Sequence, residues 1–135
     1  MESLENIVVR APRPDRRARQ IDVVVIGAGH CGLAMSQQLS GYGIDHVVLD
    51  AGDIAQRWRA ERWDNLSLLT PNWMLELPGK RYTGADNDGF MHKDTLAEWL
   101  TAYARECGAP VKRFTKVHCV PVSYTHLTLP TSFLV

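Results

Sequence analysis

The chain has 135 residues, 45% hydrophobic and 22% charged, so it is long enough for one domain but short for an enzyme that binds two cofactors. Fifteen basic residues balance fifteen acidic ones, which argues against a protein that binds nucleic acid or an anionic membrane surface. Three cysteines without metal-ligand spacing indicate neither a disulfide framework nor a zinc site, and no apolar run reaches the roughly 20 residues that span a bilayer.

The first 20 residues differ in composition from the rest of the chain. They contain five arginines and two prolines and little apolar periodicity, so we expect residues 1–20 to form a disordered arm. They also lack the apolar core of a secretory signal peptide. Together with cysteines that we expect to stay reduced, this favours a cytoplasmic protein.

A β-α-β unit is predicted directly after the arm. Residues 21–26 (IDVVVI) are mostly β-branched and do not alternate with polar residues, which predicts a strand covered on both faces. The loop GAGHCG follows at residues 27–32, and a helix then runs through residues 33–39 and ends at the glycines of residues 41 and 43. Residues 46–49 (HVVL) predict a second buried strand, parallel to the first and joined to it by a right-handed crossover.

A second helix is predicted over residues 95–107, where apolar side chains recur at the spacing of one helix face. Asp94 or Thr95 can cap its start, and Thr95 with Glu98 has the spacing of a capping box. Gly108 is placed to end it.

The segments around this helix carry weaker patterns. Residues 56–73 are rich in arginine and tryptophan without clear periodicity, and residues 78–88 (PGKRYTGADND) have the composition of a loop. Residues 111–120 alternate loosely and could form a further sheet strand.

The last residues do not match the rest of the sequence. Residues 122–131 (VSYTHLTLPT) resemble the translation of a transposase sequencing adapter, and the ending SFLV fits an index followed by a stop codon. We therefore expect residues 121–135 to be a non-native tail and exclude them from the fold. The alternative is a genuine C-terminal strand, which resequencing of the locus would reveal.

The glycine loop has the spacing and the flanking elements of a dinucleotide-binding motif. Gly27 allows a sharp turn out of the strand, Gly29 has no Cβ to block a diphosphate, and Gly32 lets the helix pack closely on the sheet. The free N–H groups and positive end of the following helix favour an anion. The candidate cofactor-binding residues of the loop are Gly27, Ala28, Gly29, His30, Cys31 and Gly32.

Asp50 ends the second strand, 23 residues after Gly27, close to the usual spacing for an acid that binds a ribose. Its carboxylate can accept both ribose hydroxyls, and its charge would repel the 2′-phosphate of NADP. The alternative is a glycine-rich turn with no ligand. A redox role for Cys31 is weaker than the interpretation that a small side chain fills the helix start.

Three runs further along the chain resemble the flavin-containing monooxygenases, above all the YUCCA-type enzymes and their bacterial relatives. They are DIAQRWR at residues 53–59, RWDNLSLLTP at residues 62–71 and LELP at residues 75–78. The helix TLAEWLTAYAREC and residues 114–117 also resemble family elements. The resemblance covers residues 21–120 and implies FAD, held in the N-terminal part of an incomplete α/β, Rossmann-type FAD/NAD(P)-binding domain with a parallel sheet.

The resemblance also implies roles for single residues. Arg57 and Trp58 would lie against the ribityl-diphosphate part of FAD, and Val117 would touch the adenine through its backbone. Leu69 and Thr70 would approach the isoalloxazine ring. The alternatives are core packing for Trp58 and a solvated surface charge for Arg57. For Arg62, too, a solvated surface charge is weighed against a place beside the diphosphate, which suits an arginine chemically.

The resemblance further implies an enzyme that takes hydride from NADPH onto FAD and oxygenates a small molecule. The NADPH-binding glycine loop of the family is absent and would lie beyond Val120, so we expect this chain alone to be inactive. The alternatives are an NAD-binding dehydrogenase, a flavin reductase without oxygen insertion, or an inactive fragment that binds only a dinucleotide. No catalytic residue is nominated, because His92 and His118 are isolated histidines, and the oligomeric state stays open.

Overall fold

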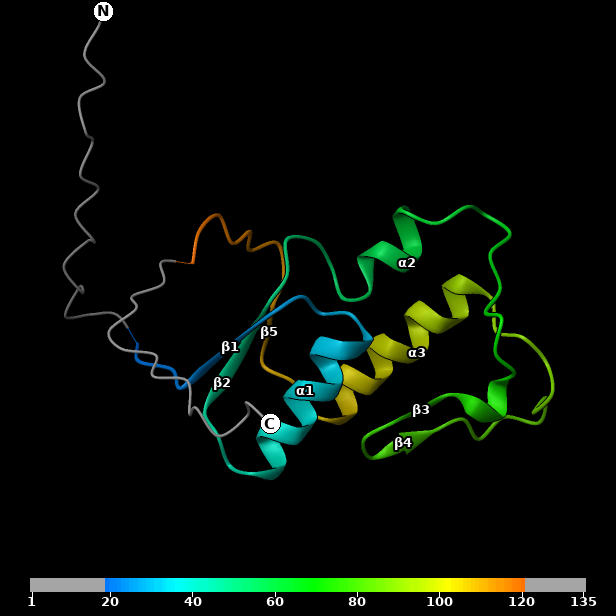
Figure 1. Ribbon diagram of the computed structural model, residues 1–135, viewed down its shortest axis with the longest axis horizontal. Helices are drawn as coiled ribbons and strands as arrows, with labels where there is room; N and C mark the ends of the chain where they lie inside the picture. The colour runs from blue at the N-terminus through cyan, green and yellow to red at the C-terminus, as the bar shows by residue number, and fades with distance from the viewer. Residues whose placement is uncertain (1–18, 121–135) are drawn as a thin grey trace, which may run out of the picture.

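The computed structural model describes residues 19–120, so most of the predicted arm and all of the predicted tail (121–135) lie outside the described residues. Its centre is a parallel sheet in the order β1-β2-β5, formed by β1 (Val23–Ile26), β2 (His46–Leu49) and β5 (Val111–Lys112). Helices α1 (His30–Gly41) and α3 (Lys93–Glu106) lie next to each other beside the sheet (Figure 1). The predicted fold class, an incomplete α/β domain with a parallel sheet, is confirmed.

The β-α-β unit forms as predicted. β1 pairs with β2 in parallel, from Val23 opposite His46 to Ile26 opposite Leu49, and α1 connects the two strands. β2 is buried over most of its length because it is the central strand of this sheet and α1 packs against it.

Coverage of β1 on both faces is wrong for the described part of the chain. Val24 and Ile26 are 51% and 59% exposed, whereas Val23 and Val25 are only partly exposed. Successive side chains of a strand point to opposite faces, and Val25 packs against the buried core on the face that α1 covers. The other face of β1 carries apolar side chains that no described segment fully buries.

The glycines end both long helices, although not at every predicted position. Gly43 and Gly108 have the left-handed φ values of +69° and +62° that follow α1 and α3, whereas Gly41 is the last residue of α1 itself. The predicted cap of α3 is wrong. His92 caps the helix, because its Nδ1 accepts a hydrogen bond from the Asp94 amide at 3.3 Å, and α3 begins one residue before Asp94.

The core lies between the sheet, α1 and α3. Leu33, Ser36 and Leu39 of α1 are buried, and α3 presents its predicted apolar face to the same interior. The buried core consists of Ala28, Leu33, Val48, Ala55, Met91, Leu96, Ala97, Leu100, Tyr103 and Ala104.

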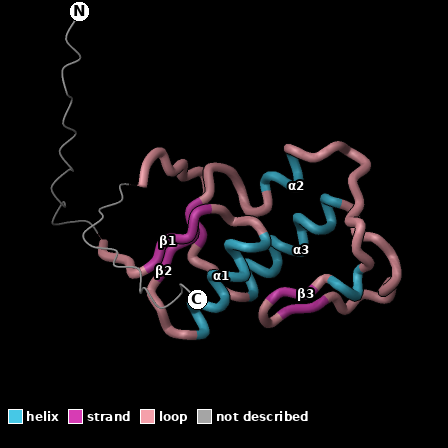
Figure 2. Tube along the Cα trace, in the orientation of Figure 1, coloured by secondary structure: helices cyan, strands magenta, loops and turns pink. Residues whose placement is uncertain are grey.

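The middle of the chain contains short elements that the sequence pattern did not reveal. α2 (Gln56–Ala60) packs on α3, and a 3-10 helix, η1 (Asn72–Met74), precedes a small hairpin of β3 (Glu76–Leu77) and β4 (Lys80–Arg81) (Figure 2). Residues 78–88 were predicted as a loop, which is wrong for the β4 strand. The turn forms because Gly79 adopts a φ of +79°, and the Tyr103 hydroxyl donates a 2.6 Å hydrogen bond to the Pro78 carbonyl.

The predicted strand over residues 111–120 is much shorter in the structure. Only Val111 and Lys112 pair with β2, because Phe114 turns the chain with a left-handed φ of +54°. The following residues cross the carboxyl ends of the strands, where the Thr115 amide donates to the Asp50 carbonyl at 2.7 Å. Among residues 19–120, no helix has the length and apolar character needed to cross a membrane.

Candidate functional site

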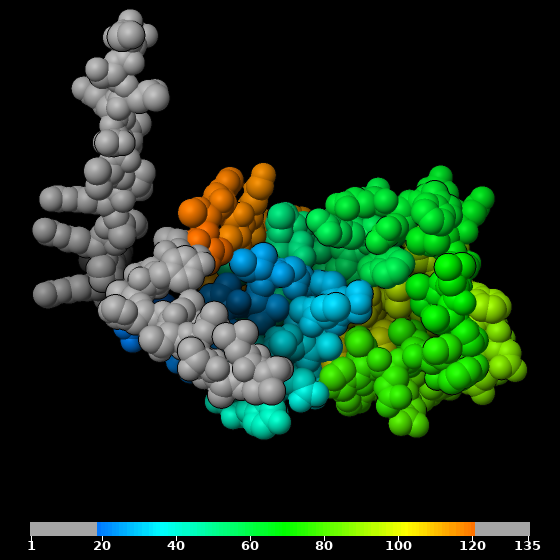
Figure 3. Space-filling model, in the orientation of Figure 1, coloured from blue at the N-terminus to red at the C-terminus, as the bar shows by residue number. Residues whose placement is uncertain are grey.

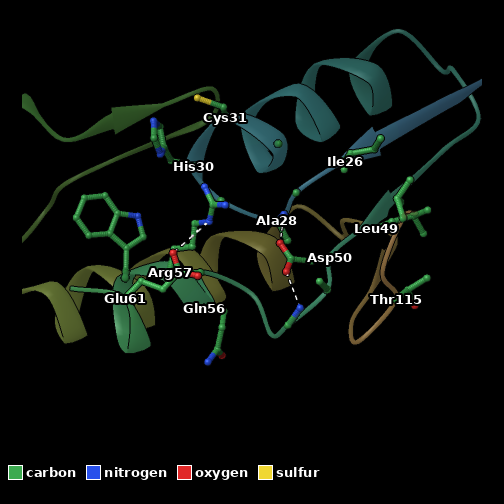
Figure 4. Close-up of a pocket in the computed structure, with 18 of the residues that line it drawn as sticks. Ile26, Ala28, His30, Cys31, Leu49, Asp50, Gln56, Arg57, Glu61 and Thr115 are labelled. Carbon is green, nitrogen blue, oxygen red and sulfur yellow. Dashed lines mark hydrogen bonds and ion pairs between the residues drawn. The ribbon is translucent and has the colours of Figure 1, made fainter. Parts of the chain in front are cut away.

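A cleft of about 650 Å³ lies at the carboxyl ends of β1 and β2. Its walls are the glycine loop, the turn after β2, helix α2 and residues 115–117 (Figure 4). Ten of the residues proposed from sequence line it: Gly27, Ala28, Gly29, His30, Cys31, Gly32, Asp50, Arg57, Trp58 and Val117. The carboxyl edge of a parallel sheet is the usual ligand site of this class of fold.

The glycines of the loop shape the floor of the cleft. Gly27 turns the chain out of β1 with a φ of +105°, and its amide donates to the Leu49 carbonyl at 2.7 Å. A Cβ on Gly32 would collide with the carbonyl oxygen of Gly27, so this position requires glycine for helix α1 to approach the strand. A Cβ on Gly29 would meet no protein atom within 4 Å, which leaves open space above the loop.

The N-terminus of α1 opens into the cleft without a side-chain cap. Gly29 is the N-cap, no side chain caps the helix, and its first turn contains no acidic residue. The first amides of a helix have no intrahelical acceptors and carry a partial positive charge. His30, Cys31 and Gly32 of this first turn line the cleft, so the structure here suits an anionic group such as a diphosphate.

Asp50 is held rigidly beside this helix end. Its Oδ2 accepts from the Ala28 amide at 2.7 Å and its Oδ1 from the Gly52 amide at 2.8 Å (Figure 4). Its own amide donates to the Lys112 carbonyl at 3.1 Å. A carboxylate has about four acceptor positions, so Asp50 retains capacity for the hydroxyls of a sugar.

Helix α2 forms the wall opposite the glycine loop, although none of its side chains is fully buried. Arg59 fixes it in place by donating to the Ile54 carbonyl at 2.6 Å and to Thr101 Oγ1 of α3 at 3.0 Å. The buried Lys93 ammonium donates to the Arg59 carbonyl at 3.0 Å. These bonds satisfy groups at both ends of the short helix and direct its other face toward the cleft.

Helix α2 and the two residues that follow it carry two side-chain pairs at i, i+4 spacing. Arg57 Nε lies 3.5 Å from Glu61 Oε2, and Figure 4 shows Arg57 reaching from α2 into the space before the glycine loop. The Arg62 guanidinium carbon lies 5.3 Å from the centre of the Trp58 ring. The wall facing the helix end of α1 is therefore polar, with both signs of charge present.

Leu69 and Thr70 do not lie in this cleft. Leu69 is 94% exposed, and neither residue is among those that line the hollow. Residues 65–90, in green to yellow-green, form the end of the molecule away from the parallel sheet of β1, β2 and β5 (Figures 1 and 3). The approach of Leu69 and Thr70 to a flavin ring therefore stays a prediction.

Ten lining residues were not among the candidate cofactor-binding residues proposed from sequence: Ile26, Leu49, Ala51, Gly52, Ala55, Gln56, Glu61, Arg62, Thr115 and Lys116. The spacing of four residues from Arg57 to Glu61 and from Trp58 to Arg62 is visible in the sequence, but it became meaningful only once α2 was known to be helical. Thr115 and Lys116 reach the cleft through the turn at Phe114, for which the sequence gives no clear indication.

A polar contact next to the cleft involves Asp53. The Ile54 amide donates to Asp53 Oδ1 at 2.7 Å, and this hydrogen bond, with the nearby Arg113 guanidinium at 3.3 Å, lowers the pKa of Asp53 below its ordinary value. Asp53 therefore stays ionised at neutral pH and ties the turn after β2 to the segment after β5.

The other side chains considered for catalysis or metal binding are His92 and the cysteines. His92 accepts at Nδ1 from Asp94, so its Nε2 carries the proton and donates to the Asp64 carbonyl at 2.8 Å. Cys31, Cys107 and Cys119 are free thiols. Within residues 19–120, no three His, Cys, Asp or Glu side chains gather as a metal site would require.

The chain is similar in sequence to several known proteins. A family model described as an FAD binding domain matches residues 20–63. The chain is 38% identical over 98 residues to an uncharacterised CzcO-like oxidoreductase of Geobacillus kaustophilus, covering 72% of this chain and 28% of that protein. It is 37% identical over 92 residues to the indole-3-pyruvate monooxygenase YUCCA4 of Oryza sativa, covering 67% of this chain and 21% of the relative.

A solved structure has a similar fold. The flavin-containing monooxygenase of Stenotrophomonas maltophilia is 28% identical and superposes with a TM-score of 0.61, over 70% of this chain and 28% of that structure. The chain thus spans between 21% and 28% of the length of these relatives. The open space above Gly29, the uncapped helix end and Asp50 fit an FAD molecule.

Proposed function

We propose that the whole protein is a flavin-dependent oxidoreductase, from the premise that this chain carries an FAD-binding domain and that its homologues are CzcO-like oxidoreductases and YUCCA flavin monooxygenases. The observation that carries the proposal is the cleft, where the uncapped N-terminus of α1 and the fixed Asp50 carboxylate face the same space. A helix amide end suits a diphosphate and a carboxylate suits a ribose.

Different residues of this chain bind different parts of FAD. The amides of the glycine loop and first turn of α1 bind the diphosphate, while Asp50 accepts the ribose hydroxyls and excludes a 2′-phosphate by charge. Residues 115–117 flank the end of the cleft beside Asp50, where Val117 would meet the adenine. When bound, the flavin supplies the redox chemistry, and the protein supplies position and charge.

We further propose that the whole protein uses NADPH as its hydride source and oxygenates a small molecule in the cytoplasm. The support is the similarity to proteins named as flavin monooxygenases. The second candidate is oxidoreduction without oxygen insertion, which the CzcO-like relative leaves open because it is named only as an oxidoreductase. The domain of residues 21–120 would supply the first part of the FAD site, and Leu69 and Thr70 would approach the flavin ring.

Two measurements test these proposals. Purified full-length protein should carry the absorbance bands of bound flavin. A colourless protein that retains no flavin bands after incubation with FAD and removal of the unbound FAD would contradict the flavoprotein assignment. With NADPH and a panel of small organic substrates, oxygen uptake should match the formation of oxygenated product. NADPH oxidation that only reduces free flavin or another acceptor would favour the second candidate.

A further inference from the structure

We propose that Arg62 is a further cofactor-binding residue, a ligand of the diphosphate, and that Trp58 is the platform that positions it. The proposal rests on the function proposed above, because it assigns a contact within the same cleft. Arg62 lines the cleft together with the first turn of α1, and its guanidinium lies over the Trp58 ring at 5.3 Å.

The geometry of the pair favours a preorganised ligand. Trp58 is partly buried and packs against the hydrophobic core, so its ring has little freedom to move. A guanidinium held by a cation–π contact keeps its N–H donors available for an anion. The contact with Trp58 therefore holds a cation at the cleft wall without using these donors.

The other arginine of this wall is in a different situation. Arg57 forms an ion pair with Glu61 at 3.5 Å, so the two side chains together add no net charge to the cleft. Within the described residues, Arg62 has no carboxylate within ion-pair distance. Arg62, which follows the C-cap of α2, thus adds a positive charge to this wall that no described carboxylate offsets.

This difference predicts distinct roles for the two arginines. Arg62 contacts the diphosphate, whereas the main contribution of Arg57 is to neutralise Glu61, whose bare charge would repel the same anion. Removing Arg57 then weakens binding only as long as Glu61 is present. Removing Arg62 weakens binding whether Glu61 is present or not.

A double-mutant cycle in the full-length apoprotein separates these roles. The dissociation constants of FAD and of ADP are measured by titration calorimetry for Arg62→Gln and Arg57→Gln, each in the parent and in a Glu61→Gln background. Because one charge-assisted hydrogen bond is lost, Arg62→Gln should raise both constants about tenfold in either background. Arg57→Gln should weaken binding in the parent and lose most of that effect in the Glu61→Gln background.

Two further variants and one control accompany the cycle. Trp58→Phe keeps an aromatic platform and should retain most of the affinity, whereas Trp58→Leu should lose about as much as Arg62→Gln. Arg62→Lys should recover part of the affinity through its charge. Arg105→Gln, an exposed arginine of α3 outside the cleft, should change neither constant.

The outcomes distinguish this proposal from the proposed function. If the parent binds FAD and ADP and Arg62→Gln behaves like Arg105→Gln, the assignment of Arg62 is wrong while the FAD site stands. If Arg62→Gln weakens FAD but not ADP, the residue contacts the flavin part and not the diphosphate, which also overturns the proposal. A parent that binds neither ligand would overturn the proposed function itself.

Discussion

Among the described glycines, Gly32 is the one where an added Cβ would collide with the protein backbone. A methyl group there meets the Gly27 carbonyl oxygen, so Gly32→Ala must push α1 away from the end of β1. We expect a loss of about 1–3 kcal/mol in the free energy of unfolding, the usual cost of overpacking, measured by urea denaturation of the apoprotein. Gly41→Ala is the matched control: it lies in the same helix with open space at its Cβ, and should leave the protein equally stable or slightly more stable.

Asp50 is the second residue whose substitution is informative. Asp50→Asn removes the charge and places an amide NH2 against the N–H of Ala28 or of Gly52, so one of these two hydrogen bonds is lost. It should weaken FAD binding and relax the discrimination against a 2′-phosphate. Competition of FAD binding by NAD and by NADP measures this directly. Unchanged preference in the variant would show that another group sets the selectivity.

At the scale of elements, α3 is linked to the β3–β4 hairpin by Tyr103. Its side chain is 1% exposed, and burial, with a smaller contribution from Cys107, raises the pKa of Tyr103 to about 12. The pKa of Tyr103 in the folded protein exceeds the unfolded value of about 10, so the contribution of the protonated hydroxyl to the free energy of unfolding is fully present below pH 10. This contribution is lost as the pH rises from 10 through 12, and the free energy of unfolding should fall by about 2–3 kcal/mol.

Tyr103→Phe isolates this effect. The variant should be less stable than the parent at neutral pH by about 1 kcal/mol, because the hydrogen bond to the Pro78 carbonyl is lost. Because the parent loses more than this difference between pH 10 and 12, its denaturation midpoint should fall to that of the variant within this window and lie below it at pH 12. A constant difference across that window, followed by circular dichroism, would mean that Tyr103 does not titrate in the folded protein.

The Arg59 side chain attaches helix α2 to α3. Arg59→Met removes the bonds to Ile54 and Thr101 but keeps an apolar stem, so α2 should detach while α3 stays folded. Hydrogen exchange should accelerate in residues 56–60 and not in the buried positions of α3, and FAD should bind more weakly. Equal protection of α2 in the variant and the parent would contradict this role.

The elements also show what sequence could and could not predict. The unit of β1, α1 and β2 was predictable because local patterns determine it: a β-branched run, glycines at a turn and a buried second strand. The His92 cap was missed because histidine is not a usual capping residue and its second contact comes from Asp64, far along the chain. The exposed face of β1 was missed because the composition of a strand does not reveal what covers it.

The candidate site also contains residues that the sequence predicts and residues that it does not. The glycine loop and Asp50 follow from spacing, because a diphosphate and a ribose impose fixed requirements on a β-α-β unit. Glu61 and Arg62 could not be placed until α2 and its attachment through Arg59 were known. Those contacts join segments about forty residues apart, and a single sequence carries no direct information on such pairs.

For the whole molecule, the question is whether the cleft at the end of α1 holds FAD. The dissociation constant of FAD for full-length Gly29→Val, compared with the parent, answers it. The φ of Gly29 is −87° and its ψ −171°, an extended conformation open to valine, and the new side chain would project into the cleft without meeting protein atoms at its Cβ. Because several charge-assisted bonds would be lost, binding should weaken about a hundredfold or more while apoprotein unfolding stays unchanged. Parent-like affinity in a stable Gly29→Val protein would show that FAD binds elsewhere.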